Sequence, residues 1–159
     1  MHHTSTMRSF RQIAAACLLV GGCIQITYAA DLNIVLLDSK SGHPLHGKLV
    51  CIAYPAGGAA DRGVVQEQRA CHRTDSAGVA TFTLPDPAPD KVNVELATNN
   101  LVPCFASQAF PVAPAMKDGS VIKNTCGGPT TDTAETGELV LYGHQKSIRE
   151  VLGTARNEF

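Results

Sequence analysis

The segment TDSAGVATFTLP, Thr74–Pro85, decides the fold because a turn leads directly into a strand with one apolar face. Asp75 and Gly78 are typical turn residues. Three apolar residues follow at every second position, namely Ala80, Phe82 and Leu84. Alternation with period two indicates a β-strand that buries one face and exposes the other.

An earlier turn repeats this arrangement. The segment SGHPLHG, Ser41–Gly47, separates two apolar runs, Leu32–Leu37 and Leu49–Tyr54. Turns between short apolar strands are typical of an all-β fold. We therefore expect a single antiparallel β-sandwich of about seven strands with a short C-terminal α-helix.

The same pattern predicts the remaining strands. The run Glu138–Gly143 is apolar at consecutive positions, so we expect it at a sheet centre with both faces buried. The prolines of Pro85–Asp90 lack an amide hydrogen, which makes this segment a connector. The expected strands are Leu32–Leu37, Gly47–Tyr54, Val64–Arg73, Val79–Leu84, Val92–Leu96 and Glu138–Gly143.

Residues 98–136 have a looser pattern, because prolines and turn-forming pairs interrupt every apolar run. Within this region, Val112–Asp118 is expected to form one or two helical turns that Gly119 ends in a left-handed conformation. We expect a disulfide to hold the region together.

The first 29 residues have the features of a secretory leader. Arg8 and Arg11 precede the largely apolar run Ile13–Ile26, and small residues end at Ala29. We expect cleavage after Ala29 and export of residues 30–159 to the periplasm or the medium.

The leader segment has two alternative interpretations. A transmembrane anchor is disfavoured because Gln25 and Thr27 shorten the apolar run below the roughly 20 residues that a spanning helix needs. The second alternative is a lipoprotein anchored through Cys23, since VGGC at Val20–Cys23 resembles the box before a lipid-modified cysteine.

Four cysteines remain after cleavage: Cys51, Cys71, Cys104 and Cys126. An even number in an exported chain predicts two disulfides. Counting alternation from the core-facing neighbours places Cys51 off the core face, with Cys71 on the facing strand of a hairpin. Three pairings are open, of which we favour 51–71 and 104–126. No pair has the spacing of a zinc knuckle.

The charge pattern argues against nucleic acid as a partner. Cleavage removes two basic residues and leaves eleven basic and fourteen acidic ones, a formal net charge of −3. The remaining basic residues are scattered singly, so no stripe is available for phosphates.

Sequence motifs for catalysis or cofactors are missing. No serine lies in a glycine-flanked elbow, and no glycine-rich loop joins a strand to a helix. His43 and His46 lie three residues apart beside a turn, but two imidazoles make a poor metal site, and neither His72 nor His144 is placed by spacing as a third ligand. We expect no catalytic residue, no cofactor and no metal.

A calcium site is a further alternative. Its candidate ligands are four aspartates at one end of the sandwich, namely Asp38, Asp75, Asp86 and Asp90. Aspartate also caps turns, and we favour this simpler role. The chain has no tryptophan and few other aromatic residues, which weakens a sugar-stacking platform.

The C-terminal segment changes period. Apolar residues recur at helical spacing, namely Ile148, Val151, Leu152 and Ala155. Ser147 and Glu150 form a capping box at the start. We expect residues 146–159 to form an amphipathic helix that packs on the sandwich as a lid, in preference to a dock for a partner.

Two segments together resemble a known family. Asp38–Gly47 and Thr74–Gly78, with the alternating strand that follows, look like the carboxypeptidase regulatory-like domain, a transthyretin-like (prealbumin-like) β-sandwich common in exported bacterial proteins. The match covers Leu32–Ala97. The rest, including GELVLY at Gly137–Tyr142, resembles the second half of short exported bacterial proteins of unknown function. The resemblance implies a non-catalytic accessory or binding module.

Two enzyme families share this sandwich. Hydroxyisourate hydrolases end in a tyrosine-arginine-glycine-serine tail, whereas this chain ends in Arg156–Phe159. Intradiol dioxygenases bind iron through two tyrosines and two histidines, and the spacing of Tyr54, Tyr142 and the histidines differs from their motif.

The expected layout is a leader at residues 1–29, a sandwich at 30–145 with a disulfide-stapled region at 98–136, and a helix at 146–159. We expect a non-enzymatic exported module that binds a cell-envelope polysaccharide or protein. The alternative is a structural envelope subunit or lipoprotein without a ligand, and a small metal-dependent enzyme or hydrolase comes third.

Overall fold

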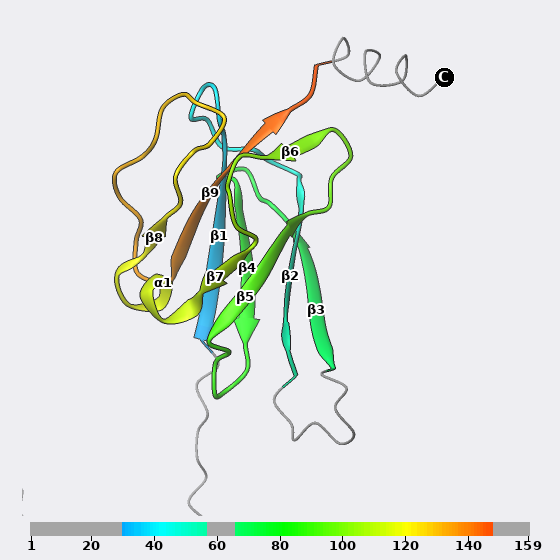
Figure 1. Ribbon diagram of the computed structural model, residues 1–159, viewed down its shortest axis with the longest axis vertical. Coiled ribbons are helices and arrows are strands. Elements are labelled where there is room, and N and C mark those ends of the chain that lie inside the picture. The colour runs from blue at the N-terminus through cyan, green and yellow to red at the C-terminus, as the bar shows by residue number, and fades with distance from the viewer. Residues whose placement is uncertain (1–29, 57–65, 148–159) are drawn as a thin grey trace, which may run out of the picture.

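A computed structural model describes residues 30–56 and 66–147 of the chain. The expected leader, with Cys23, and the expected helix from residue 148 onward lie outside the described residues. Within them the chain forms nine strands and one helix, and the strands build two sheets that face each other (Figure 1). The expected all-β sandwich with a short helix is confirmed as a fold class.

The first sheet, sheet A, has the strand order β4-β1-β9-β6, with β8 beside β9. The second, sheet B, has the order β3-β2-β5-β7. The strands of sheet A are β1 (Ala30–Asp38), β4 (Val79–Leu84), β6 (Leu101–Pro103), β8 (Ser120–Val121) and β9 (Glu138–Gln145). Those of sheet B are β2 (Leu49–Pro55), β3 (Glu67–Arg73), β5 (Lys91–Leu96) and β7 (Ala109–Pro111).

Most neighbouring strands are antiparallel, but β9 pairs in parallel with both β1 and β8. The sandwich is therefore antiparallel except at these two pairs. Strand β9 returns from the long 104–136 region and enters sheet A beside β1 in the same direction. Its apolar residues are buried on both faces, as its sequence predicts.

The alternating residues of both sheets form one core between the layers. Phe82, Ile34 and Leu141 of sheet A and Ile52, Val92 and Val94 of sheet B are at most 1% exposed. A fully buried aliphatic or aromatic side chain contributes about 1.5–3 kcal/mol, so these positions supply the main stabilisation of the fold.

The 98–136 region is more ordered than its sequence pattern indicates. It contains the short strands β6, β7 and β8, which proline and glycine spacing concealed. The helix α1 (Val112–Asp118) has the predicted bounds. Gly119 has a positive φ of 75°, but its ψ of 160° differs from the expected left-handed helical stop.

A second, smaller core lies on the outer side of sheet A, beneath the 104–136 segment. Cys104, Val140 and Tyr142 are buried there. The Thr131 N–H donates a hydrogen bond of 2.7 Å to the Tyr142 hydroxyl oxygen, which ties the segment to the sheet. Part of the long region, including Cys104 and Ala134, therefore packs on the outer side of sheet A, whereas β7 and α1 contribute to the main core.

Candidate functional site

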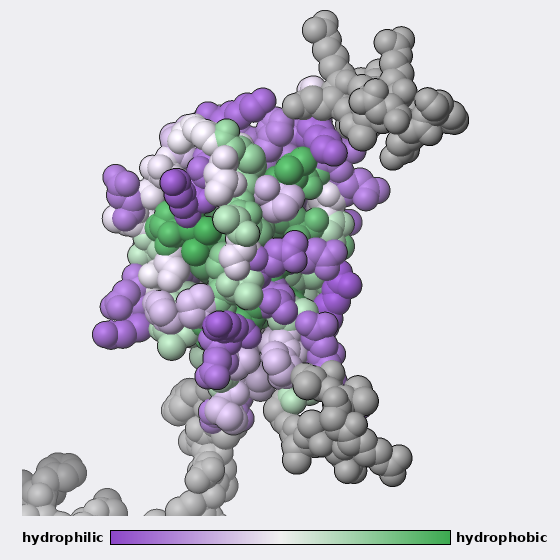
Figure 2. Space-filling view, viewed as in Figure 1, coloured by the Kyte–Doolittle hydropathy of each residue, from purple (hydrophilic) through white to green (hydrophobic). Residues whose placement is uncertain are grey.

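Several turns meet at one end of the sandwich, and we call this surface the loop end. It comprises residues 39–48, 74–78 and 97–100 and the end of β9 at residues 143–147. These segments converge at the upper end of the view in Figure 1. On the face shown in Figure 2, hydrophilic side chains dominate this end.

Asp38 organises the first of these turns. Its carboxylate accepts hydrogen bonds from the Lys40 and Ser41 N–H groups at 3.1 and 2.8 Å and from the Ser41 hydroxyl at 2.8 Å. Burial by itself raises the pKa of Asp38, but these hydrogen bonds and the electrostatic effect of His144 outweigh burial and lower the pKa below its ordinary value. The charged form of Asp38 is thus built into the turn.

Asp75 organises the second turn in the same way, by accepting hydrogen bonds from the Ala77 and Val79 N–H groups at 2.8 and 2.9 Å. Asp86 and Asp90 lie at the opposite end of the sandwich, because they follow Leu84, which pairs with Ala30 at the start of β1. The four carboxylates are therefore split between the two ends and cannot form the alternative calcium site, whereas Asp38 and Asp75 cap turns as expected.

The histidines do not converge. His43 and His46 are exposed in the first turn, whereas His72 lies on β3 and stacks on Phe82 with ring centroids 4.8 Å apart. His144 lies on β9 and acts electrostatically on Asp38. In residues 30–56 and 66–147, no group of three or more histidine, cysteine or acidic side chains is placed to hold a metal ion.

The loop end instead gathers cations. Lys40, Lys48, Arg73 and Lys146 lie in or beside its turns. The Lys48 ammonium donates to the Gln145 side-chain oxygen at 3.0 Å, and the Arg73 guanidinium donates to the Gly47 carbonyl at 2.8 Å. Within the described part of the chain, none of these four cations forms an ion pair with a carboxylate.

Two threonines, buried Thr74 and half-buried Thr98, brace the turns that carry these cations. The Thr74 hydroxyl donates to the Leu45 carbonyl at 2.6 Å and accepts from the Lys48 N–H at 2.9 Å, and Thr74 is 3% exposed. The Thr98 hydroxyl accepts from the Leu49 N–H at 2.7 Å. The cations are therefore presented from a fixed backbone.

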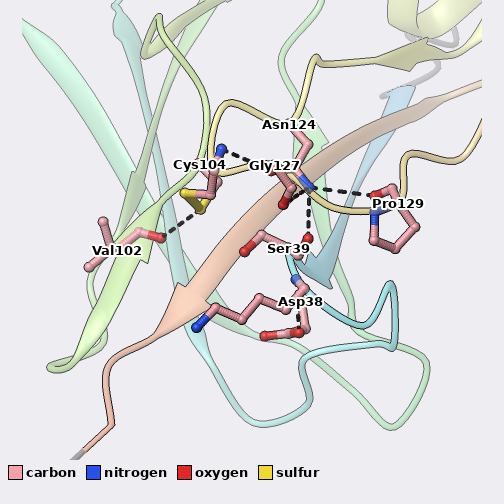
Figure 3. Close-up of a disulfide and its surroundings, with 9 residues drawn as sticks. Asp38, Ser39, Val102, Cys104, Asn124, Gly127 and Pro129 are labelled. Atoms are coloured by element: carbon pink, nitrogen blue, oxygen red, sulfur yellow. Dashed lines mark hydrogen bonds between the residues drawn. A yellow bond between two sulfur atoms is a disulfide. The ribbon is translucent and has the colours of Figure 1, made fainter. Parts of the chain in front are cut away.

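Asn124 joins the stapled region to the loop end (Figure 3). Its side-chain nitrogen donates to the carbonyls of Ser39, Gly127 and Pro129 at 2.9, 3.3 and 3.5 Å, and its side-chain oxygen accepts from the Cys126 N–H at 3.1 Å. The disulfide between Cys104 and Cys126 closes the same segment. Buried Cys104 anchors the bridge in the second core.

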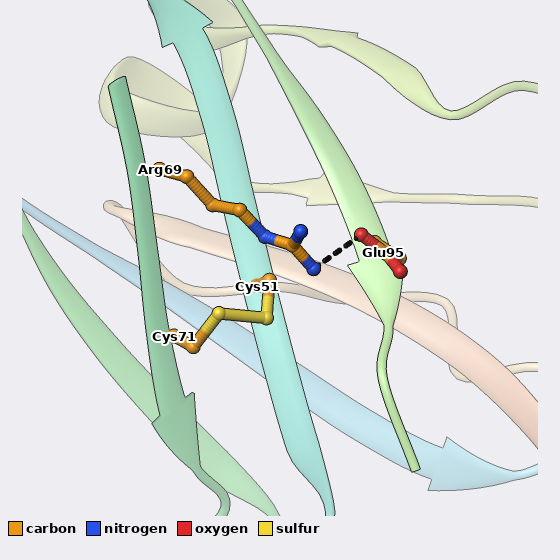
Figure 4. A network of polar contacts seen from close by, with 4 residues as sticks. All are labelled: Cys51, Arg69, Cys71 and Glu95. Atoms are coloured by element: carbon orange, nitrogen blue, oxygen red, sulfur yellow. Dashed lines mark hydrogen bonds and ion pairs between the residues drawn. A yellow bond between two sulfur atoms is a disulfide. The ribbon is translucent and has the colours of Figure 1, made fainter. Parts of the chain in front are cut away.

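The second disulfide lies on the outer face of sheet B, where Cys51 of β2 pairs with Cys71 of β3 directly opposite. This connectivity, like that of Cys104 and Cys126, is the one favoured from the sequence. The Arg69 guanidinium reaches across β2 to the Glu95 carboxylate of β5 at 2.6 Å (Figure 4). Cys51 beneath this bridge is only 1% exposed although it points away from the main core.

Sequence reasoning missed the loop-end cations, Asn124 and the Arg69–Glu95 bridge. The cations are spread over more than one hundred residues of sequence, so no local run marks them. A weak signal existed for Asn124, because a turn-forming asparagine precedes Cys126 by two residues.

Comparison of this chain with family models, with curated proteins and with solved structures finds no match in any of the three. Its two disulfides are typical of an oxidising environment. Within the described ranges, no helix has the length and apolar character needed to cross a bilayer.

Proposed function

We propose that this chain is an exported, non-catalytic β-sandwich module that binds a cell-envelope partner through its loop end. The observation that carries the proposal is the set of four cations there without carboxylate partners among the described residues. The loop end has two carboxylates of its own, Asp38 and Asp75, and both are held by turn hydrogen bonds. The excess of positive charge favours an anionic partner.

The rigidity of the loop end supports a binding role. Thr74, Thr98 and Asn124 fix the turns through hydrogen bonds to the backbone. A surface that is ordered before binding loses little conformational entropy when a partner docks.

The partner classes expected from the sequence are polysaccharide and protein. Each tyrosine and phenylalanine ring in the described residues is at most 8% exposed, namely Tyr54, Phe82, Phe105, Phe110 and Tyr142. Stacking on neutral sugar faces needs exposed rings, so the loop end favours recognition of phosphate or carboxylate groups. We therefore propose an acidic envelope polysaccharide as the partner, and an acidic protein surface is the second candidate.

Export is supported by the leader pattern and by the two disulfides. The resemblance to the carboxypeptidase regulatory-like domain adds support for an accessory binding module. Lipid anchoring through Cys23 remains the alternative, and labelling with a radioactive fatty acid tests it, because Cys23→Ala would abolish the label only in a lipoprotein.

The binding proposal is tested with the oxidised mature protein, residues 30–159, on immobilised acidic envelope polysaccharide at several salt concentrations. We expect retention that weakens as salt rises, because the contacts are between exposed charges. The double variant Lys48→Glu/Lys146→Glu should lose retention. Lys91→Glu, at the opposite end of sheet B, is the matched control and should behave like the wild type.

Three outcomes separate the alternatives. Retention by an acidic protein but by no polysaccharide would identify the second partner class. Equal retention of the loop-end variant and the control would overturn the assignment to the loop end. No retention on any anionic envelope component would overturn the proposed function.

A further inference from the structure

Strand β3 is the outermost strand of sheet B and pairs only with β2 among the described strands. Every residue of Glu67–Arg73 except Ala70 is exposed. At seven residues, β3 is the longest strand at a sheet edge in the described part of the chain. Such an edge offers a row of backbone donors and acceptors to a further strand.

The register shows which backbone groups point outward. Cys51 and Cys71 face each other with Cα atoms 4.0 Å apart, which identifies a pair that exchanges no backbone hydrogen bonds. The Thr74 N–H donates to the Lys48 carbonyl. The backbone N–H and C=O groups of the even-numbered residues of β3 therefore point toward β2. By alternation, four residues direct their N–H and C=O groups away from the sheet, namely Glu67, Arg69, Cys71 and Arg73.

The side chains of these outward-bonding positions have a self-complementary charge order. Glu67 lies at one end of β3 and Arg73 at the other. We propose that a second copy of this chain adds to this edge, with the two β3 strands antiparallel about a two-fold axis at Ala70. Glu67 then lies directly opposite the partner subunit's Arg73, and symmetry repeats the pair.

The charged side chains of β3 favour a two-fold axis at Ala70 over an axis at Cys71 or at Arg69. An axis at Cys71 would place Arg69 opposite the partner subunit's Arg73, and an axis at Arg69 would place two copies of Arg69 opposite each other. Like charges directly opposite are destabilising, whereas opposite charges stabilise the pair. Of these three axes, only the one at Ala70 avoids an Arg–Arg pair and forms Glu–Arg pairs, and it also pairs all seven residues of β3.

The geometry of β3 suits this pairing. Four outward-bonding residues on each copy form about eight inter-chain hydrogen bonds. The Cys51–Cys71 disulfide holds β3 on β2, and the Arg69–Glu95 ion pair joins β3 to β5, so little ordering of β3 is required when the second copy binds. Arg73 uses one guanidinium nitrogen for the Gly47 carbonyl, which leaves other N–H groups for the partner.

The charge distribution of the whole module favours the same orientation. Antiparallel pairing places the basic loop end beside the opposite end of the second copy. That end has four exposed acidic residues, namely Asp31, Asp86, Asp90 and Glu67, against one exposed lysine, Lys91. The dimer surface shares Arg73 with the loop end, whereas Glu67 lies at the other end of β3 and Lys40, Lys48 and Lys146 lie off β3.

Sedimentation equilibrium on the oxidised mature protein from about 1 µM to 1 mM tests the dimer, since a small interface gives weak association. We expect a monomer–dimer equilibrium. Glu67→Arg or Arg73→Glu alone should weaken it roughly tenfold or more, because two attractive pairs become repulsive. The combined exchange Glu67→Arg/Arg73→Glu should restore it, and Lys91→Glu should leave it unchanged.

A wild-type monomer throughout this range would overturn the proposal. A dimer that tolerates both single reversals, or one that the combined exchange fails to restore, would also overturn it. If the exchanged variant does not fold, Glu67→Gln decides instead, because neutralisation must weaken the dimer less than Glu67→Arg does. Retention of Glu67→Arg on the polysaccharide matrix shows that the two surfaces act separately.

Discussion

The side chain of Asn124 donates a hydrogen bond of 2.9 Å to the Ser39 carbonyl, which lies 85 residues earlier in the chain. Both residues are buried, and the bond joins the stapled segment to the first turn of the loop end. The candidate binding surface thus depends on a contact between the two halves of the sequence.

Asn124→Ala should destabilise the fold by about 1–3 kcal/mol, because it leaves the buried Ser39 carbonyl without its donor. Urea unfolding of the oxidised protein measures this loss. Lys123→Ala changes the exposed neighbour and should stay within about 0.5 kcal/mol of the wild type. Equal effects of the two substitutions would show that Asn124 has no special structural role.

Gly128→Ala should destabilise by about 3 kcal/mol or more, because a Cβ atom at Gly128 would overlap the Ser39 carbonyl oxygen and φ is 113°. Gly127→Ala is the matched control: φ is 75°, and its Cβ meets nothing within 4 Å. Only backbone strain of about 1–2 kcal/mol is expected there. Melting temperatures that fall equally in both variants would contradict the close approach to Ser39.

Removal of each disulfide should lower the free energy of unfolding by a different amount. They close loops of similar length, with separations of 20 and 22 residues, so each is worth about 3 kcal/mol by chain entropy. Cys104 also packs in the second core, so Cys104→Ala/Cys126→Ala should cost about 1 kcal/mol more than Cys51→Ala/Cys71→Ala. Guanidinium unfolding of the two double variants gives the order, and the reverse order would be inconsistent with that packing.

Acid should destabilise the protein through Asp38. The pKa of Asp38 is lowered in the folded state, so its stabilising contribution is complete above the ordinary carboxyl pKa and is lost as pH falls toward the folded value. We expect the stability difference between the wild type and Asp38→Asn to shrink as pH falls below about 5. Thermal melts across this range provide the measurement. If the stability difference between the two proteins does not change with pH, the negative charge of Asp38 does not contribute to folding stability.

The strands that carry the main core could be predicted from the sequence because each buries one face. Phe82 and its alternating neighbours show the pattern locally, and no distant information is needed. The parallel pairing of β1 with β9 could not be predicted, because it depends on where a segment returns after more than one hundred residues. The short strands β6, β7 and β8 have two or three residues each, too few for a period to appear.

At the loop end too, the sequence predicts local turns but not contacts between residues that are far apart in the chain. Turn residues such as Asp38 and Asp75 are recognisable alone, and their role as turn caps follows from residue type. Their distance from Asp86 and Asp90 depends on the directions of the strands between them. The sequence alone does not show these directions, so it leaves a calcium site at one end as an alternative. Lys48 and Gln145 meet across 97 residues, and no spacing rule connects them.

The proposed function requires that the protein is exported and that its two disulfides form. Its most direct test is the intact mass of the protein recovered from the periplasm or medium of cells that express the full-length chain. We predict a polypeptide that begins at Ala30 and lacks the four thiol hydrogens of the reduced chain, owing to its two disulfides. Recovery of only an uncleaved chain inside the cell, with all cysteines alkylated as free thiols, would contradict the account.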